Sequence, residues 1–190
     1  MASGKRTLWI VLAVCLGVAA LGVGLYGIVV GFQTEAQPGD HDRVVTAEDF
    51  GFEVDASAEV LTRTRYIDGT LSIDYEYDLS DDGLYVSCFH DREHTDRGAR
   101  EVYLGQVAAG GTLMEAFSDD VAVVDSSLTL GWGDQSNVET ILFEGVEAGY
   151  KIDARQGKHV FNVIIMGVVF EPGELEQRLG EALERAVNVD

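Results

Sequence analysis

The densest group of potential metal ligands is the seven-residue run from Cys88 to His94. Its two histidines stand four residues apart, a spacing that on a helix would place both imidazoles on one face. A thiolate or a carboxylate in the same run would supply further ligands for a divalent metal. One hypothesis is therefore a metal site formed by Cys88, His90, Asp91 and His94. A solvated polar junction between a strand and a helix is the competing interpretation.

The remaining motifs for chemistry carry little specificity. Residues 78–83 match the first half of a calcium-binding loop, but the twelfth position would be Phe89, where such loops need a bidentate glutamate. The sequence contains neither a Gly-x-Ser-x-Gly nucleophile motif nor a glycine-rich phosphate-binding loop. We therefore expect no cofactor and favour a non-catalytic domain. A catalytic site assembled from residues distant in sequence is the open alternative.

The charge distribution divides the chain into two unlike parts. Residues 7–34 carry no charged side chain, whereas the part after residue 34 holds all 33 acidic but only 11 of the 13 basic residues, a net charge of −22. Such a field repels nucleic acid and anionic lipid headgroups, and it attracts basic proteins or divalent cations. We therefore exclude a nucleic-acid partner and expect the acidic part to contact a protein of unknown identity.

The uncharged part contains an unbroken apolar run from Leu8 to Val30. As a helix at about 1.5 Å per residue it would reach roughly 34 Å, enough to cross a bilayer core of about 30 Å. Two basic residues precede the run, and the positive-inside rule places them in the cytoplasm. We therefore predict a cytoplasmic N-terminus (1–6), a transmembrane helix in the lipid bilayer (7–32) and a C-terminal domain in the periplasm or outside the cell. Removal of the segment by cleavage near Ala36 is the alternative.

Small residues recur along one side of this predicted helix, at every third or fourth position. They are Ala13, Gly17, Ala20, Gly24, Gly27 and Gly31. Small residues let two helix backbones approach closely, and helices in lipid associate through such faces. The stripe therefore predicts that the helix packs in a homodimer or against another membrane protein.

The part after the apolar run is predicted to be a linker followed by one domain. Residues 33–47 contain proline, glycine and charges without apolar periodicity, as linkers do. In residues 48–190, period-2 patterns predict strands at 50–54, 60–67, 70–79, 84–90, 121–130, 138–147, 150–154 and 159–166. Helical patterns begin near Asp96, with an interruption at Gly110-Gly111, and near Pro172, where the apolar stripe is Leu175, Leu179, Ala182, Leu183 and Ala186. We therefore predict an acidic α+β domain.

The predicted fold class is thus α+β, with an N-terminal transmembrane helix plus a mainly antiparallel sheet covered by two helices. Three local patterns sharpen it: a Gly-Phe-x-Val opening at Gly51, a Gly157-Lys158 hairpin leading into residues 160–164, and a terminal helix rich in Glu and Leu. Over about residues 48–188 this arrangement resembles the PsbP-like three-layer α/β/α domain. The resemblance implies a binding or assembly module more often than an enzyme, and it transfers no site residue.

Together these patterns predict a single-pass, membrane-anchored, non-catalytic envelope protein whose acidic extracytoplasmic domain mediates protein interaction or assembly. The alternative is a metal-binding or metal-dependent domain that uses the Cys88, His90 and His94 cluster. The predicted membrane boundary separates the two cysteines, Cys15 and Cys88, so we expect no disulfide within the domain.

Overall fold

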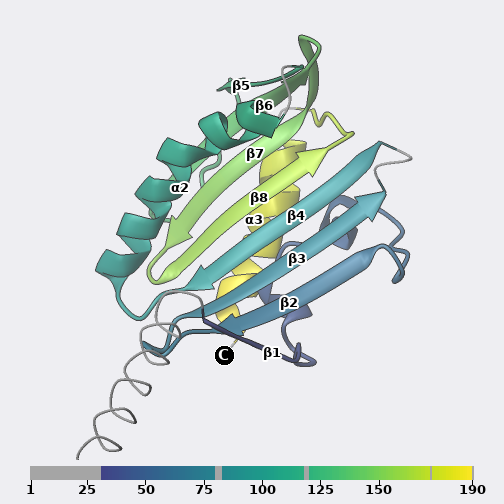
Figure 1. The fold of residues 1–190 in the computed structure, drawn as a ribbon. Coiled ribbons are helices and arrows are strands. Elements are labelled where there is room, and N and C mark those ends of the chain that lie inside the picture. Colours follow the sequence, from purple (N-terminus) through teal and green to yellow (C-terminus); the bar gives the residue numbers. More distant parts are fainter. Residues whose placement is uncertain (1–30, 80–82, 118–119, 172, 190) are drawn as a thin grey trace, which may run out of the picture.

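Segments of alternating polar and apolar residues build the sheet on which the fold rests. The computed structural model describes residues 31–79, 83–117, 120–171 and 173–189. Eight strands among these residues form one antiparallel sheet in the order β1-β2-β3-β4-β8-β7-β6-β5 (Figure 1). The strands are β1 Phe32–Thr34, β2 Glu59–Arg65, β3 Leu71–Leu79, β4 Leu84–Arg92, β5 Val121–Asp125, β6 Gln135–Phe143, β7 Val146–Gln156 and β8 His159–Met166.

The pattern of β3 shows how the sheet acquires two unlike faces. Successive side chains of a strand point to opposite sides. Ile73, Tyr75 and Tyr77 are fully buried, whereas Asp74 and Glu76 between them are exposed. We call the side of the three buried residues the core face and the opposite side the α2 face, after the helix that lies on it.

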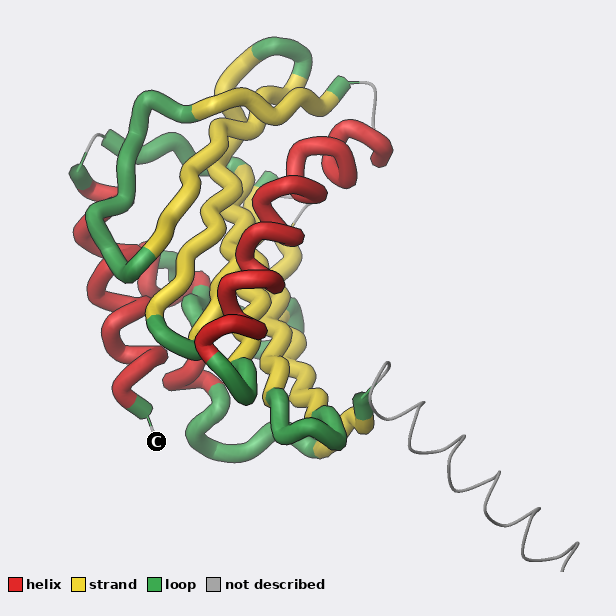
Figure 2. The backbone as a smooth tube through the Cα atoms, turned by 90° about the vertical axis from the view of Figure 1, so that its left-hand side faces the viewer, coloured by secondary structure: helices red, strands yellow, loops and turns green. Residues whose placement is uncertain are grey.

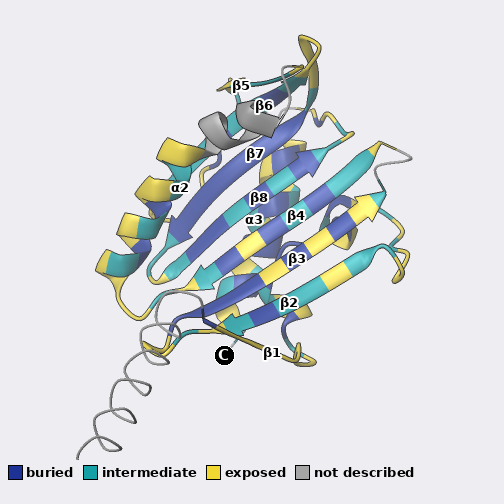
Figure 3. Cartoon of the chain, viewed as in Figure 1, coloured by how far each residue is buried: buried dark blue, intermediate teal, exposed yellow. Residues whose placement is uncertain are grey.

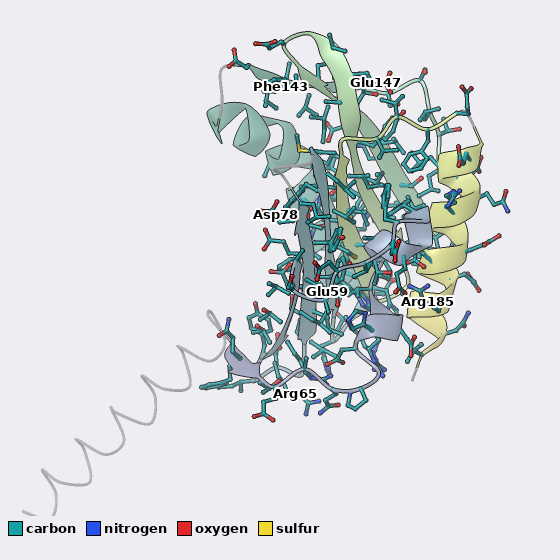
Figure 4. All side chains as sticks on the ribbon, turned by 90° about the vertical axis from the view of Figure 1, so that its right-hand side faces the viewer. Glu59, Arg65, Asp78, Phe143, Glu147 and Arg185 are labelled. Atoms are coloured by element: carbon teal, nitrogen blue, oxygen red, sulfur yellow. The ribbon has the colours of Figure 1, made fainter. Side chains whose placement is uncertain are left out.

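Helix α3 (Glu174–Asn188) and two short 3-10 helices cover the core face. The predicted apolar stripe of α3 is confirmed, because all five of its residues are buried: Leu175, Leu179, Ala182, Leu183 and Ala186. The 3-10 helices η1 (His41–Arg43) and η2 (Ala47–Phe50) lie beside α3. Arg185 links α3 to the segment that contains the two 3-10 helices. It pairs with the Asp49 carboxylate and donates a hydrogen bond to the Val44 carbonyl at 2.8 Å (Figure 4).

Helix α2 (Asp96–Phe117) lies on the other side of the sheet, so that helices and sheet form three layers (Figure 2). It contacts β5, β7 and β8. Its packing rests on a small apolar cluster in which Ala99 and Tyr103 meet Val160 of β8. The predicted interruption at Gly110-Gly111 is wrong, since the helix continues through both glycines.

The predicted fold class is wrong in its N-terminal part. Across the described ranges we find no helix with the length and apolar character that a membrane crossing needs. Most of the predicted span 7–32 lies outside the described residues, and its last residue, Phe32, belongs to β1 and pairs with Arg65 of β2. The strand forms there because β2 offers its backbone groups as hydrogen-bond partners. The single-pass, signal-anchor and membrane assignments rested on that helix and are corrected with it.

The small-residue stripe is affected in the same way. Five of its six members, Ala13 to Gly27, lie outside the described residues. Gly31 is described, and it has a left-handed backbone (φ +71°) rather than a helical one. An added Cβ at this position would lie 2.4 Å from Thr64 Cγ2, so the glycine serves close approach of the chain to β2.

The segment predicted to be a linker packs into the domain instead. Val44, Val45 and Ala47 are fully buried and belong to the main core. The buried carboxylate of Asp40 forms an ion pair with Arg63 of β2. Apolar contacts far along the chain therefore decide the structure of residues 33–47, whatever their polar composition suggests. The strand expected at 50–54 is likewise absent, and η2 ends at Phe50.

Candidate functional site

The structure does not bring the predicted metal ligands together. Cys88 and His90 are two residues apart on β4, so both point to the core face, whereas Asp91 points to the α2 face. His94 lies beyond the end of the strand in an exposed turn. The two histidines do not share a helix face, because His90 belongs to a strand and His94 follows its end. Within the described residues no group of three or more His, Cys, Asp or Glu side chains is arranged to hold a metal ion.

The two core-facing members are packed as neutral groups. The Cys88 thiol is fully buried and accepts a hydrogen bond from the Val45 amide at 3.3 Å, and burial raises its pKa to about 12. The His90 ring stacks on Phe161 at 4.2 Å, and its Nε2 lies 3.0 Å from Nδ1 of His159. Burial, with the neighbouring His159 ring, lowers the pKa of His90 to about 3. Both side chains thus serve the core.

A second polar group lies beneath α2. Lys151 is 2% exposed and contacts two carboxylates, Glu139 at 2.7 Å and the fully buried Asp153. Asn162 donates a further hydrogen bond to Asp153 at 2.7 Å. Because the ammonium is bound by two carboxylates, it is held as a structural cation rather than as a free nucleophile. This group organises the layer below α2 without forming a site.

The most unusual surface is the part of the α2 face that α2 leaves uncovered. The helix lies over β5, β7 and β8, while β2, β3 and β4 carry exposed side chains on the same face (Figure 3). We call this surface the open face. Strand alternation and register assign to it Val60, Thr62, Thr64, Ser72, Asp74, Glu76, Asp78, Tyr85, Ser87, Phe89 and Asp91.

The open face is acidic and apolar in composition. Asp74, Glu76 and Asp78 follow one another at alternate positions of β3, and Figure 4 shows Asp78 on the side of the sheet away from α3. The register places Thr62 and Phe89 beside Asp74, and it places Val60 and Ser87 beside Glu76. At the strand positions that define the open face there is no lysine or arginine. Asp74 and Glu76 therefore have no cation beside them on the neighbouring strands.

Burial and mutual repulsion raise the pKa of two carboxyl groups on the open face. Burial and the nearby Glu76 raise the pKa of Asp74. Burial and the charge of Asp74 also raise the pKa of Asp91, which a hydrogen bond from Ser72 only partly offsets. A carboxylate beside a cation would show the opposite shift. The open face therefore holds unneutralised negative charge that a cationic group would stabilise.

A cavity of about 270 Å³ lies at one end of the open face. It is lined by Tyr66, Asp68, Thr70, Phe89, Asp91, Glu93 and Val102, the last from α2. Burial, with the charges of Asp91 and Asp68, raises the pKa of Glu93. Two aromatic rings and three carboxylates in one hollow are groups that suit a guanidinium or an ammonium. We call this cavity the carboxylate pocket.

Of the predicted site residues, only Asp91 belongs to this surface. The alternation of residues 70–79 places Asp74 and Glu76 on the polar side of a half-buried strand, and it does not single them out as site residues. The pattern that marks them is three acidic residues at alternate positions of β3. Their paired residues on β2 and β4 include no lysine or arginine. That pattern depends on strand register, which pairs residues such as Asp74 and Phe89 that are distant in the sequence.

Comparisons with known protein families, curated proteins and solved structures identify no relative of this chain. No protein-family model matches the chain, and neither a curated protein nor a solved structure matches it. The resemblance to the PsbP-like domain therefore stays a prediction from sequence pattern.

Proposed function

We propose that the domain is a non-catalytic protein-interaction module and that the open face is its contact surface. The observation that carries the proposal is the uncovered half of the α2 face, where Asp74, Glu76 and Asp91 lie beside apolar side chains and no base. Among the described ion pairs, none involves these three carboxylates.

The energetics support binding rather than solvation alone. Asp74 and Glu76 lie two residues apart on the same face of β3, and like charges at this separation repel each other. The aromatic and aliphatic side chains of the same surface, Phe89 at 38% and Val60 at 56% exposure, gain free energy when a partner removes them from water. A surface that combines both features loses stability in the free protein and recovers it in a complex.

Site-specific photo-cross-linking of the full chain in its native host tests the proposal. A photoreactive amino acid at Ser87, which lies beside Glu76 on the open face, is expected to give a discrete adduct with another protein. The same amino acid at Glu181, on the exposed side of α3, is the control and is expected to give none. Failure to form an adduct from Ser87, or the same adduct from both positions, would contradict the proposal.

A further inference from the structure

The partner element can be specified further, on the basis of the proposed function above. We propose that it is a basic amphipathic helix, with lysine or arginine at every fourth position, that lies along β3 beside α2. Four properties of the open face indicate such a helix: its backbone, its width, the spacing of its charges and the carboxylate pocket.

The backbone of β3 and β4 leaves no place for an added strand. β3 and β4 are paired along both sides, whereas β2 pairs with β1 only at Arg63–Arg65. An extended peptide gains affinity by pairing with a free sheet edge, which the two strands that carry Asp74, Glu76 and Phe89 do not offer. An element that lies on a sheet face has to satisfy its own backbone hydrogen bonds, and a helix does so.

The width of the surface suits one helix. Three strands at about 4.8 Å spacing span roughly 14 Å, and a helix with its side chains is about 10 Å across. Because α2 already covers the other half of the same face, a second helix would complete the layer. It would cover Phe89 and Val60, two exposed apolar side chains of the open face.

The spacing of the carboxylates matches helical periodicity. Asp74, Glu76 and Asp78 occupy alternate positions of one strand, so neighbouring members are about 6.7 Å apart. Residues four apart on a helix are separated by about 6 Å along its axis. Basic side chains at i, i+4 and i+8 would therefore each meet a carboxylate of β3.

The carboxylate pocket lies at the Ser72 end of this line and suits an arginine. Asp91 and Glu93 accept hydrogen bonds, and Tyr66 and Phe89 offer aromatic faces to a guanidinium. Ser72, paired with Asp91 in the register, points to the same face. Ser72 is 2% exposed, and its hydroxyl lies beside Asp91 and partly offsets the rise in the pKa of that carboxyl group.

Fluorescence anisotropy with labelled peptides and the full chain tests this inference. The first peptide is a helix of about 16 residues with arginine at i, i+4 and i+8 and leucine on the adjoining positions. The second has the same composition with the arginines adjacent, and the third carries a central proline that breaks the helix. We expect the first to bind at least about tenfold more tightly than the others.

Paired variants locate the binding. Asp74→Asn with Glu76→Gln is expected to weaken the first peptide about tenfold. Glu48→Gln with Glu171→Gln changes the net charge equally at exposed positions outside the open face, and it is expected to change affinity less than about twofold. Amides replace exposed, mutually repelling carboxylates here, so folding should be retained, as thermal unfolding will check.

The outcomes separate the two proposals. Equal binding of the three peptides, or equal weakening by both variant pairs, overturns the basic-helix inference. If the Ser87 adduct still forms in that case, the proposed interaction surface stands with a partner of different chemistry. If no Ser87 adduct forms, the proposed function itself fails, whatever the peptides do.

Discussion

Lys151→Met is expected to lower the free energy of unfolding by about 3–5 kcal/mol. Lys151 is 2% exposed beneath α2, and its ammonium is the cation that both Glu139 and Asp153 contact. Methionine preserves most of the side-chain volume but leaves two carboxylates near each other without a cation in a region of low dielectric. Urea unfolding of the full chain at pH 7 measures the loss.

Two further variants identify the cause. Arg97→Met removes a cation from an exposed ion pair with Glu101, whose side chains are 87% and 64% exposed, and it should cost less than about 1 kcal/mol. Lys151→Met combined with Glu139→Gln and Asp153→Asn removes the buried charges together and should recover much of the stability. A loss below about 1 kcal/mol for Lys151→Met alone would show that the buried carboxylates are compensated in some other way.

Acidification from pH 7 to pH 5 is expected to lower the free energy of unfolding by about 2 kcal/mol through His90. The pKa of His90 is about 3 in the folded chain, whereas an unfolded histidine has a pKa of about 6.5. The unfolded state therefore binds the proton first, and stability falls by up to about 1.4 kcal/mol per pH unit between pH 6.5 and pH 3. Burial also lowers the pKa of His159, which adds to the same effect.

Three acidic groups of the open face and the carboxylate pocket act in the opposite direction. Asp74, Asp91 and Glu93 have raised pKa values, so the folded state takes up their protons first and gains stability on acidification. Carboxyl groups ordinarily titrate near pH 4. Above about pH 5, where the measurement is made, the histidines therefore determine how the free energy of unfolding changes with pH.

Variants of His90 in the core and His94 in an exposed turn test the assignment. His90→Phe should reduce the fall in the free energy of unfolding between pH 7 and pH 5, and His94→Ala should leave it unchanged. Equal slopes in His90→Phe and the original chain would refute the assignment. Because His90→Phe alters the core, NMR titration of the original chain gives a second measurement, in which the His90 ring should not titrate above pH 5.

The long strands and the terminal helix could be predicted because their signals are local. The alternation of residues 70–79 becomes β3, with the polar and apolar sides assigned as expected. A missed turn explains the boundary error around residues 138–147. Glu144 adopts a left-handed backbone (φ 50°), a conformation rarely found outside glycine, and with Gly145 it closes a hairpin between β6 and β7.

The N-terminal segment and the candidate site could not be predicted because they depend on contacts between distant residues. The Val45 amide donates a hydrogen bond to the Cys88 thiol, 43 residues further along the chain. No local pattern in residues 33–47 predicts that contact. The open face likewise arises from where α2 stops covering the sheet. Spacing alone grouped Cys88, His90 and Asp91, and strand alternation separates Asp91 from the other two.

The packing of the N-terminal segment also determines where the chain can be divided. A cut at residue 48, the domain boundary that composition suggests, would remove Val44, Val45 and Ala47 from the core. It would also leave Arg63 without its Asp40 partner. Such a fragment would lack part of its hydrophobic interior and would carry an unpaired buried guanidinium. The smallest piece that keeps these contacts therefore starts at or before Asp40, and expression, crystallisation or domain-swap experiments should respect that limit.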